Sequence, residues 1–202
     1  MASKEKKKNG EPEEKLGWKK NLILYLHDLI YMLIAILLVF LLLFRVIVVS
    51  GDSMYSTLWD GDYLLLLSNL FYHEPKQGDI VVISKKTFED GTPIVKRVIA
   101  TEGQTVDIDF NNGVVYVDDQ PLTEPYTNSP TVDSAGTVFP LTVEENCIFV
   151  LGDNRGVSKD SRSWEIGQID KREVLGKALY RFLPGTNHNM NARDYKRIGA
   201  VK

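Results

Sequence analysis

One lysine of this sequence stands where an amine could lose its charge. Lys96 lies in the apolar run Pro93–Ala100, and with a strand period of two it shares a face with Ile94 and Val98. Burial disfavours the charged ammonium and lowers a lysine pKa from ~10.4 by up to ~3–5 units when burial is complete. A neutral amine could then act as a general base. The alternative is a strand lysine whose stem packs while its head reaches water.

Two polar segments could supply partners for such a base. Ser53 follows Gly51-Asp52, where glycine permits a tight backbone and the close approach of a substrate chain, although a serine in this setting is by itself a common turn residue. The polar segment Gly152–Trp164 directly follows the apolar run Ile148–Leu151. Loops on a rigid sheet commonly hold functional residues. The alternative for this segment is an ordinary solvated turn.

A long apolar segment near the amino end predicts a membrane helix. Leu22–Phe44 is interrupted only by His27 and Asp28, and 23 helical residues would cover the ~30 Å hydrocarbon core. We therefore expect a single transmembrane helix over residues 21–45, since no second run of this length follows. A secretory signal peptide has a shorter apolar core of ~7–15 residues; cleavage near Val49–Gly51 is the alternative.

Charge predicts the orientation of this helix. Residues 1–20 hold seven lysines against four glutamates, and basic segments of this kind stay in the cytoplasm. The segment 1–20 is therefore expected to be a cytoplasmic tail, and 46–202 an extracytoplasmic domain at the cell membrane. Ser53 follows Arg45 by eight residues, so even an extended chain carries it only ~26 Å from the membrane exit. The lipid bilayer is an expected partner.

The rest of the chain reads as mostly antiparallel β structure. Short runs rich in Val, Ile and Leu alternate with Gly-Asp or Asn-Gly breaks. The expected strands are Tyr63–Leu67, Ile80–Ser84, Ile94–Ala100, Thr105–Phe110, Val114–Val117, Ile148–Leu151 and Leu175–Leu183. Asn112-Gly113 predicts a hairpin because both residues tolerate positive φ. Residues from about 103 to 146, which include four prolines, are expected to form a small inserted β subdomain.

Composition excludes several classes of function. The net charge of −3 indicates no basic face, so no nucleic-acid partner is expected. The three histidines, at 27, 73 and 188, and the single cysteine form no ligand set, and we expect neither a metal nor another cofactor. Cys147 lies in an apolar run and is expected to be a small core residue.

Taken in order, these segments resemble the bacterial type I signal peptidases, above all their short Gram-positive forms. The matching motifs are Ser-Met-x-x-Thr-Leu at 53–58, Gly-Asp at 61–62 and 78–79, Lys-Arg-Val-Ile at 96–99, Gly-Asp-Asn-Arg followed by Ser-x-Asp-Ser-Arg within 152–162, and Leu-Gly-Lys-Ala at 175–178. Each motif is weak alone, but their joint occurrence behind one apolar segment is highly specific. The resemblance extends to Leu183 and implies a signal-peptidase-like β domain.

The resemblance also implies a Ser/Lys dyad. Ser53 corresponds to the nucleophile, Lys96 to the base that deprotonates it, and Ser158 to a serine whose hydroxyl orients the lysine amine. Such a dyad would cleave peptides through an acyl-enzyme. The implied substrates are exported preproteins with small residues at the first and third positions before the cut. The signal peptides of these preproteins and the secretion translocon are the implied partners.

A charged cluster is implied beside the dyad. Asp160 and Arg162, with Arg97, correspond to residues that hold the 152–162 loop against the strand of Lys96. Arg97 lies on the opposite face of that strand from Lys96, which separates the supporting ion pairs from the proposed base.

The chain departs from the family pattern near the nucleophile. Ser56 stands where relatives usually have proline. Many relatives also place a serine that helps bind the oxyanion two positions before the nucleophile, where this chain has Gly51. The expected oxyanion donors are therefore the backbone N–H groups of Ser53 and Gly51, with Ser50 as an alternative.

Two other functions are compatible with parts of the pattern. A self-cleaving repressor-type Ser/Lys peptidase shares the β fold, but it would carry a DNA-binding helical domain where this chain has an apolar helix. A non-catalytic membrane adaptor could keep the fold without activity. The joint presence of Ser53, Lys96 and Ser158 argues against the adaptor.

Overall fold

The computed structural model of the protein describes residues 17–186 and 192–201. Most of the basic tail predicted over 1–20 lies outside these residues, and so does His188. The chain divides into two units, a helical one up to Phe40 and a β domain from Leu41 onward. The residues with predicted chemistry all belong to the β domain.

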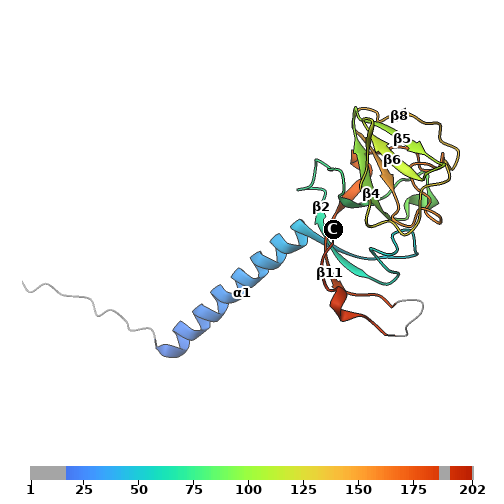
Figure 1. The fold of residues 1–202 in the computed structure, drawn as a ribbon. Helices are drawn as coiled ribbons and strands as arrows, with labels where there is room; N and C mark the ends of the chain where they lie inside the picture. The colour runs from blue at the N-terminus through green and yellow to red at the C-terminus, as the bar shows by residue number, and fades with distance from the viewer. Residues whose placement is uncertain (1–16, 187–191, 202) are drawn as a thin grey trace, which may run out of the picture. The chain divides into compact units, whose positions relative to one another are not determined.

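The amino-terminal unit is formed by one long helix. α1 runs from Trp18 to Leu43, contains neither proline nor glycine, and buries none of its side chains (Figure 1). By length and composition it could cross a bilayer. The helix predicted over Leu22–Phe44 is present, although it begins four residues earlier and ends one residue sooner.

Phe44 begins a strand instead of ending the helix. β1, Phe44–Val48, pairs antiparallel along its whole length with β2, Tyr63–Ser68. The placement of Phe44 and Arg45 in the helical segment was therefore wrong. Hydrophobicity alone does not separate an apolar helix end from an apolar strand, whereas four β-branched residues in succession, at 46–49, favour the strand.

A main antiparallel sheet forms the body of the β domain. Its neighbouring strands follow the order β1-β2-β11-β3-β4-β9-β10, and β12 pairs with β11. Beyond β1 and β2 the strands are β3 (Ile80–Ile83), β4 (Ile94–Thr101), β9 (Cys147–Leu151), β10 (Ile169–Asp170), β11 (Val174–Leu183) and β12 (Gly199–Ala200). The pairings are antiparallel throughout, so the predicted fold class is confirmed. Short 3-10 helices occur at η1 (Glu89–Gly91), η2 (Lys171–Glu173) and η3 (Tyr195–Arg197).

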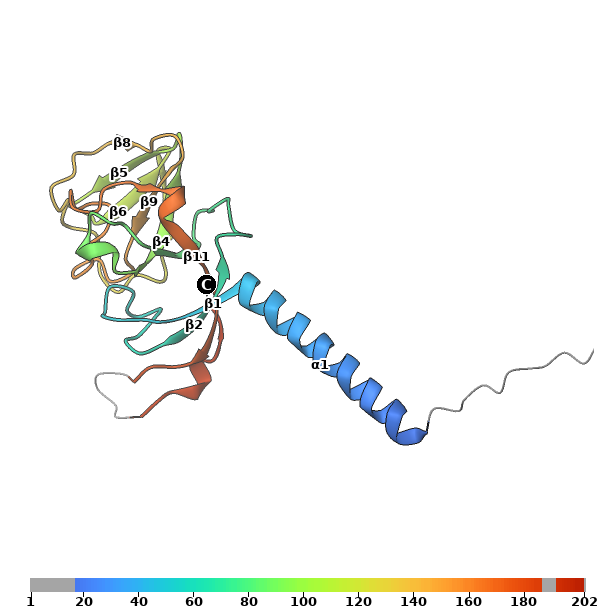
Figure 2. The ribbon, with the colours of Figure 1, turned by 180° about the vertical axis from the view of Figure 1, so that it is seen from behind.

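A second, four-stranded sheet lies within the predicted insertion. Its strands, in spatial order, are β7 (Gln120–Pro121), β6 (Val114–Val117), β5 (Thr105–Asp109) and β8 (Leu141–Thr142). Figures 1 and 2 both show β5, β6 and β8 at the end of the β domain next to β4, with β2 and β11 toward the other end. Ile99 and Phe149 of the main sheet pack with Val106 and Val115 of the small one, and Cys147 lies half-buried beside them. The two sheets therefore share a core.

The predicted hairpin is present, but its turn is longer than two residues. Asp109 pairs with Val114, which leaves residues 110–113 as the connection. Gly113 alone among these four takes a positive φ, at 70°. The Asp109 carboxylate accepts hydrogen bonds from the backbone N–H groups of Asn111 and Asn112 and fixes this longer turn.

The core also anchors the turn that carries Ser53. Met54 and Leu58 are buried against Leu64 and Leu66 of β2. The Leu58 N–H donates to the Met54 carbonyl at 2.8 Å, which closes one helical turn directly after the serine. Apolar burial on both sides of this turn therefore limits the positions that Ser53 can take.

Two glycines allow a test of how tightly the insertion packs. Gly113 and Gly103 have similar φ angles, 70° and 79°. A Cβ at Gly113 would lie 2.3 Å from Cβ of Pro130, whereas a Cβ at Gly103 would meet nothing within 4 Å. We expect Gly103→Ala to lower the free energy of unfolding by about 1 kcal/mol through its backbone alone, and Gly113→Ala by about 3 kcal/mol because overlap is added. Urea unfolding of the full chain in detergent, followed by tryptophan fluorescence, measures both; equal losses would contradict this packing.

Candidate active site

The structure brings Ser53 and Lys96 into contact. Lys96 lies on β4, between β3 and β9, and only 3% of its surface is exposed. Its Nζ donates hydrogen bonds to Ser53 Oγ at 2.8 Å and to the Val95 carbonyl at 3.0 Å. An amine and a hydroxyl at this distance can exchange a proton directly.

Burial also favours the neutral form of the Lys96 amine. Removal from water lowers the pKa of Lys96 from 10.5 to about 8. The carboxylates of Asp160, Asp153 and Glu89 act in the opposite direction and keep the pKa from falling further. The amine is therefore balanced between desolvation and nearby negative charge, and a substantial fraction of it is unprotonated near pH 8.

A loop after β9 holds the serine turn in place. The Asn154 backbone N–H donates to the Ser53 carbonyl at 3.0 Å, and Asn154 Nδ2 donates to the Asp52 carbonyl at 3.1 Å. These two bonds attach the backbone of the proposed nucleophile to a segment about one hundred residues later. The serine hydroxyl is thereby positioned by backbone contacts, independently of its contact with the lysine.

Asp153 connects that loop to the strand of the lysine. It is fully buried and accepts hydrogen bonds from Arg97 Nε at 2.8 Å and from Arg97 Nη2 at 2.7 Å, in a two-pronged ion pair. The hydroxyl of Thr57, four residues after Ser53, donates to the same carboxylate. The guanidinium of Arg97 also stacks on the ring of Tyr126 in the insertion, 3.8 Å from its centroid. Asp153 therefore links the serine turn to β4.

This role of Asp153 is not apparent from the sequence. Arg97 was expected to act with Asp160 and Arg162, but its carboxylate partner is Asp153. Asp153 lies within the Gly-Asp-Asn-Arg motif, so the motif was the available signal. Whether a loop carboxylate turns inward depends on tertiary contacts that show no periodicity along the chain.

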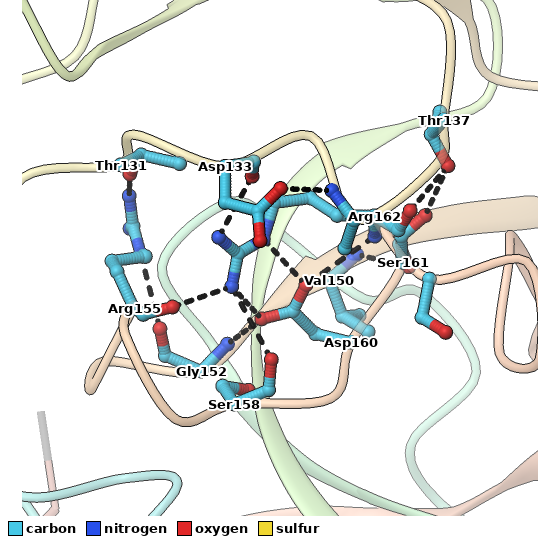
Figure 3. Close-up of polar contacts among 12 residues, drawn as sticks. Thr131, Asp133, Thr137, Val150, Gly152, Arg155, Ser158, Asp160, Ser161 and Arg162 are labelled. Atoms are coloured by element: carbon cyan, nitrogen blue, oxygen red, sulfur yellow. Dashed lines mark hydrogen bonds and ion pairs between the residues drawn. The ribbon is translucent and has the colours of Figure 1, made fainter. Parts of the chain in front are cut away.

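Asp160 and Arg162 instead stabilise the loop internally, as Figure 3 shows. Asp160 accepts from the Gly152 N–H at 3.0 Å and from Arg162 Nε at 2.8 Å, and both side chains are buried. Arg162 Nη2 also donates to the carbonyls of Arg155 and Ser158. The ion pair therefore folds the loop back on itself and fixes Gly152, the residue that leads into the Asp153 link.

Ser158 lies in the same loop, but it does not make the expected hydrogen bond with the Lys96 amine. Its Oγ is buried and makes no hydrogen bond within the described residues, and Lys96 Nζ donates elsewhere. A Cβ added at Gly152 would lie 2.2 Å from Ser158 Oγ and 2.5 Å from the Ser53 carbonyl oxygen. Gly152 thus lets the serine turn and Ser158 approach one backbone atom closely. The orienting role of Ser158 stays a prediction.

The predicted oxyanion donors differ in availability. The Gly51 N–H donates to Asp60 Oδ1 at 2.8 Å and is therefore already engaged. The Ser53 N–H makes no backbone hydrogen bond within the described residues. Of the two backbone groups predicted from the sequence, only that of Ser53 is open to a developing negative charge.

Ser53 and Lys96 face a cleft of about 420 Å³. One wall comes from β1 and the residues after it, and the other from the start of β4 and the segment before it. The lining residues are Ile47, Val48, Ser50, Ser53, Glu89, Thr92, Pro93, Ile94, Val95 and Lys96. An antiparallel β domain that sets a serine hydroxyl against a buried amine in such a cleft has the form of a serine peptidase.

Comparison with known proteins assigns the family. The model of the signal peptidase family, peptidase S26, matches residues 22–183. "Probable signal peptidase I-1" of Synechocystis sp. is 37% identical over 166 residues, which cover 76% of this chain and 81% of the relative. Signal peptidase I of Bacillus licheniformis is 35% identical over 181 residues, 85% of this chain and 95% of the relative. A crystal structure of a signal peptidase I from Enterococcus faecalis V583 is 28% identical, has a TM-score of 0.43, and covers 52% of this chain and 96% of that one.

The chain therefore belongs to the signal peptidase family, and it is a serine endopeptidase of the type I class. No group of three or more His, Cys, Asp or Glu suited to a metal ion occurs within residues 17–186 and 192–201.

The buried link at Asp153 yields a stability prediction. Asp153→Ala leaves the Arg97 guanidinium buried without its carboxylate, and we expect a loss of about 3–5 kcal/mol in the free energy of unfolding. Glu74→Ala is the matched control, because Glu74 pairs with Lys171 at 3.7 Å but is largely exposed, and it should change by less than ~1 kcal/mol. Urea unfolding of the full chain compares the two. Similar losses in the free energy of unfolding for both variants would show that the buried pair stabilises the fold no more than an exposed one.

Proposed function

We propose that this enzyme removes amino-terminal signal peptides from exported preproteins, with Ser53 as nucleophile and Lys96 as general base. The observation that carries the proposal is the 2.8 Å contact between Lys96 Nζ and Ser53 Oγ, made by an amine whose pKa is lowered to about 8. Membership of the signal peptidase family supports the choice of substrate.

The reaction would proceed by acyl transfer. Neutral Lys96 removes the proton of Ser53 Oγ. The deprotonated Oγ attacks the scissile carbonyl carbon and forms a tetrahedral oxyanion. The Lys96 ammonium donates this proton to the departing amine as the peptide bond breaks, and an acyl ester remains on Ser53. Lys96 then deprotonates water, which attacks the ester. Collapse of the second tetrahedral species breaks the bond to Ser53 Oγ, which takes back the proton from Lys96, and the released carboxylic acid loses its own proton to solvent.

The oxyanion needs donors at the serine turn. The Ser53 N–H is the first, since it is not used in a backbone hydrogen bond. We assign the second to the hydroxyl of Ser50, which lines the same cleft, because the Gly51 N–H is bound to Asp60. Loss of a single such donor costs about 2.7–4 kcal/mol of transition-state stabilisation in comparable sites.

The cleft suits an extended substrate with small side chains. A substrate strand lying between the β1 side and the start of β4 could pair with exposed backbone on both. Alternate side chains of an extended strand point the same way, so the first and third residues before the cut would face one wall together. Ile47, Ile94 and Val95 are among the residues that line this cleft, and their apolar character favours small apolar groups there.

Membrane attachment completes the proposal. α1 would anchor the enzyme in the cell membrane in a single pass, with the amino end in the cytoplasm and the peptidase domain outside. The apolar composition of α1 and the lysines before it support this orientation. Signal peptides would then reach the enzyme within the same bilayer, and the secretion translocon would be the source of these substrates.

Three variants test the dyad. Ser53→Ala removes the nucleophilic oxygen, Lys96→Ala removes the base, and Lys96→Arg replaces the base by a guanidinium that stays charged. We expect each to lose preprotein cleavage by at least about 1,000-fold, measured with the detergent-solubilised full chain and a preprotein substrate. Circular dichroism should show a native fold for the Ser53→Ala control. Cleavage at the wild-type rate by all three would refute the dyad.

The lowered pKa of Lys96 predicts the pH dependence. Only the neutral amine can accept the serine proton, so kcat/KM should rise about tenfold per pH unit below about pH 8 and level off above it. Peptide cleavage between pH 6 and pH 10 measures this profile. A profile that is flat from pH 6 to pH 8 would contradict Lys96 as the base.

The lowered pKa of Lys96 also reduces the free energy of unfolding at neutral pH. The folded state lowers the lysine pKa from 10.5 to about 8, so the charged amine is disfavoured in the fold by about 3 kcal/mol below pH 8. This cost disappears as the pH rises from about 8 to 10.5. Lys96→Met should therefore be inactive and more stable than wild type at pH 7, and this gain should shrink at pH 10.

A further inference from the structure

A segment of the inserted subdomain covers the buried ion pair that links the serine turn to β4. The Tyr126 ring lies over the guanidinium of Arg97, with 3.8 Å between the ring centroid and Cζ of Arg97. Arg97 is only 2% exposed and directly follows Lys96 on β4. The insertion therefore contacts the residue next to the proposed base.

The Tyr126 ring restrains Arg97 in a direction that its hydrogen bonds do not. Nε and Nη2 of Arg97 donate to Asp153, and Nη1 donates to the Gly78 carbonyl at 3.0 Å. The donors of a guanidinium lie in its plane, whereas an aromatic ring stacks on its face. The two kinds of contact together limit both sliding and tilting of the Arg97 head group.

Glu124 fixes the position of the tyrosine. The Tyr126 hydroxyl donates to Glu124 Oε1 at 2.9 Å, and Glu124 forms a two-pronged ion pair with Arg155. The side chains of this pair are only 10% and 1% exposed. Burial and the Glu124 carboxylate raise the pKa of the Tyr126 phenol, so the hydroxyl stays protonated and remains a donor.

Arg155 connects Glu124 to the loop after β9. Its Nε donates to the Gly152 carbonyl at 3.0 Å. Gly152 directly precedes Asp153 in the sequence. Glu124 therefore acts on Gly152 through Arg155, while Tyr126 acts on the arginine that binds Asp153.

The position of Asp153 affects the dyad through Thr57. Asp153 accepts a hydrogen bond from the hydroxyl of Thr57, which lies four residues after Ser53. A shift of Asp153 would move the serine turn relative to β4 and disturb the 2.8 Å contact between Lys96 Nζ and Ser53 Oγ. A misplacement of about 1 Å at reacting groups can reduce turnover by about 100-fold.

We propose that Tyr126 and Glu124 are positioning residues for the Ser53/Lys96 dyad, and that they act through Arg97, Arg155 and the loop after β9. This inference rests on the proposed function, because it takes Ser53 and Lys96 to be the reacting groups. In the described chain, the cleft of the dyad is lined by residues between positions 47 and 96. Loss of either positioning side chain should therefore lower kcat and leave KM unchanged.

Three variants test the two side chains. Tyr126→Leu removes the stacked ring, and we expect kcat to fall about tenfold with KM within about twofold of wild type. Tyr126→Phe keeps the ring over Arg97 and loses only the bond to Glu124, so its kcat should stay within about threefold of wild type. Glu124→Gln removes the charge that pairs with Arg155 and should lower kcat by about threefold to tenfold.

The measurement is cleavage of a preprotein by the detergent-solubilised full chain, with kcat expressed per folded enzyme. Urea unfolding of each variant gives the folded fraction. Phe139→Leu is the matched control, because Phe139 is also a half-buried aromatic residue of the insertion but packs against Phe110 and Phe149, with 5.8 and 5.9 Å between ring centroids. It should lower the free energy of unfolding and keep the wild-type kcat.

A double variant tests the route from the tyrosine to the serine. Thr57→Val removes the hydroxyl that binds Asp153 and keeps the volume of the side chain. It should lower kcat by itself. If Tyr126 acts through Asp153 and Thr57, Tyr126→Leu combined with Thr57→Val should lose no more activity than the weaker of the two single variants, whereas independent effects would multiply.

The outcomes separate this inference from the proposed function. The positioning role is overturned, and the proposed function stands, if wild type cleaves the preprotein and Tyr126→Leu keeps the wild-type kcat. The same conclusion follows if Phe139→Leu or Tyr126→Phe loses as much as Tyr126→Leu, if Glu124→Gln keeps the wild-type kcat, or if the losses multiply in the double variant. If wild type cleaves no preprotein, the proposed function fails, and this inference fails with it.

Discussion

The burial of one lysine amine is the constraint on which the rest of the structure depends. An ammonium group would normally remain in water, and the fold removes Lys96 from it almost completely. The strand that carries it is therefore central, with β3 on one side and β9 on the other. The carboxylates around it lie near enough to moderate its pKa, but within residues 17–186 and 192–201 the amine donates hydrogen bonds only to Ser53 Oγ and to a backbone carbonyl.

The polar loop after β9 positions the serine turn relative to the strand of the buried lysine. It reaches the serine turn through Asn154 and the lysine strand through Asp153, and its own shape depends on the buried pair of Asp160 and Arg162. The ion pair of Asp153 and Arg97 thus joins the loop to β4, and the pair of Asp160 and Arg162 stabilises the loop itself. Figure 3 shows that Arg162 also donates hydrogen bonds to the backbone carbonyls of Asp133, Arg155 and Ser158, so side-chain contacts hold the shape of a loop that has no regular secondary structure.

Several features were predictable because they follow a period or a motif. The apolar helix and most strands follow from hydrophobic runs, and the opposite directions of Lys96 and Arg97 follow from strand alternation. The exact partners did not follow in the same way. Arg97 binds Asp153, the Gly51 N–H binds Asp60, and the turn that contains Asn112-Gly113 spans residues 110–113. Each of these depends on loop contacts between residues whose orientation no periodic pattern sets.

The register of β4 has a consequence for protonation as well as for folding. Lys96 pairs with Val81 and Arg97 with Ile80 on β3. A slip of one residue would turn every side chain of the strand to the other face. The serine would then meet the Arg97 guanidinium, which remains charged and cannot accept its proton, while Lys96 would turn toward Asp153. Correct strand pairing therefore decides which of two adjacent cations meets the hydroxyl, and a misregistered strand would leave the serine without a base.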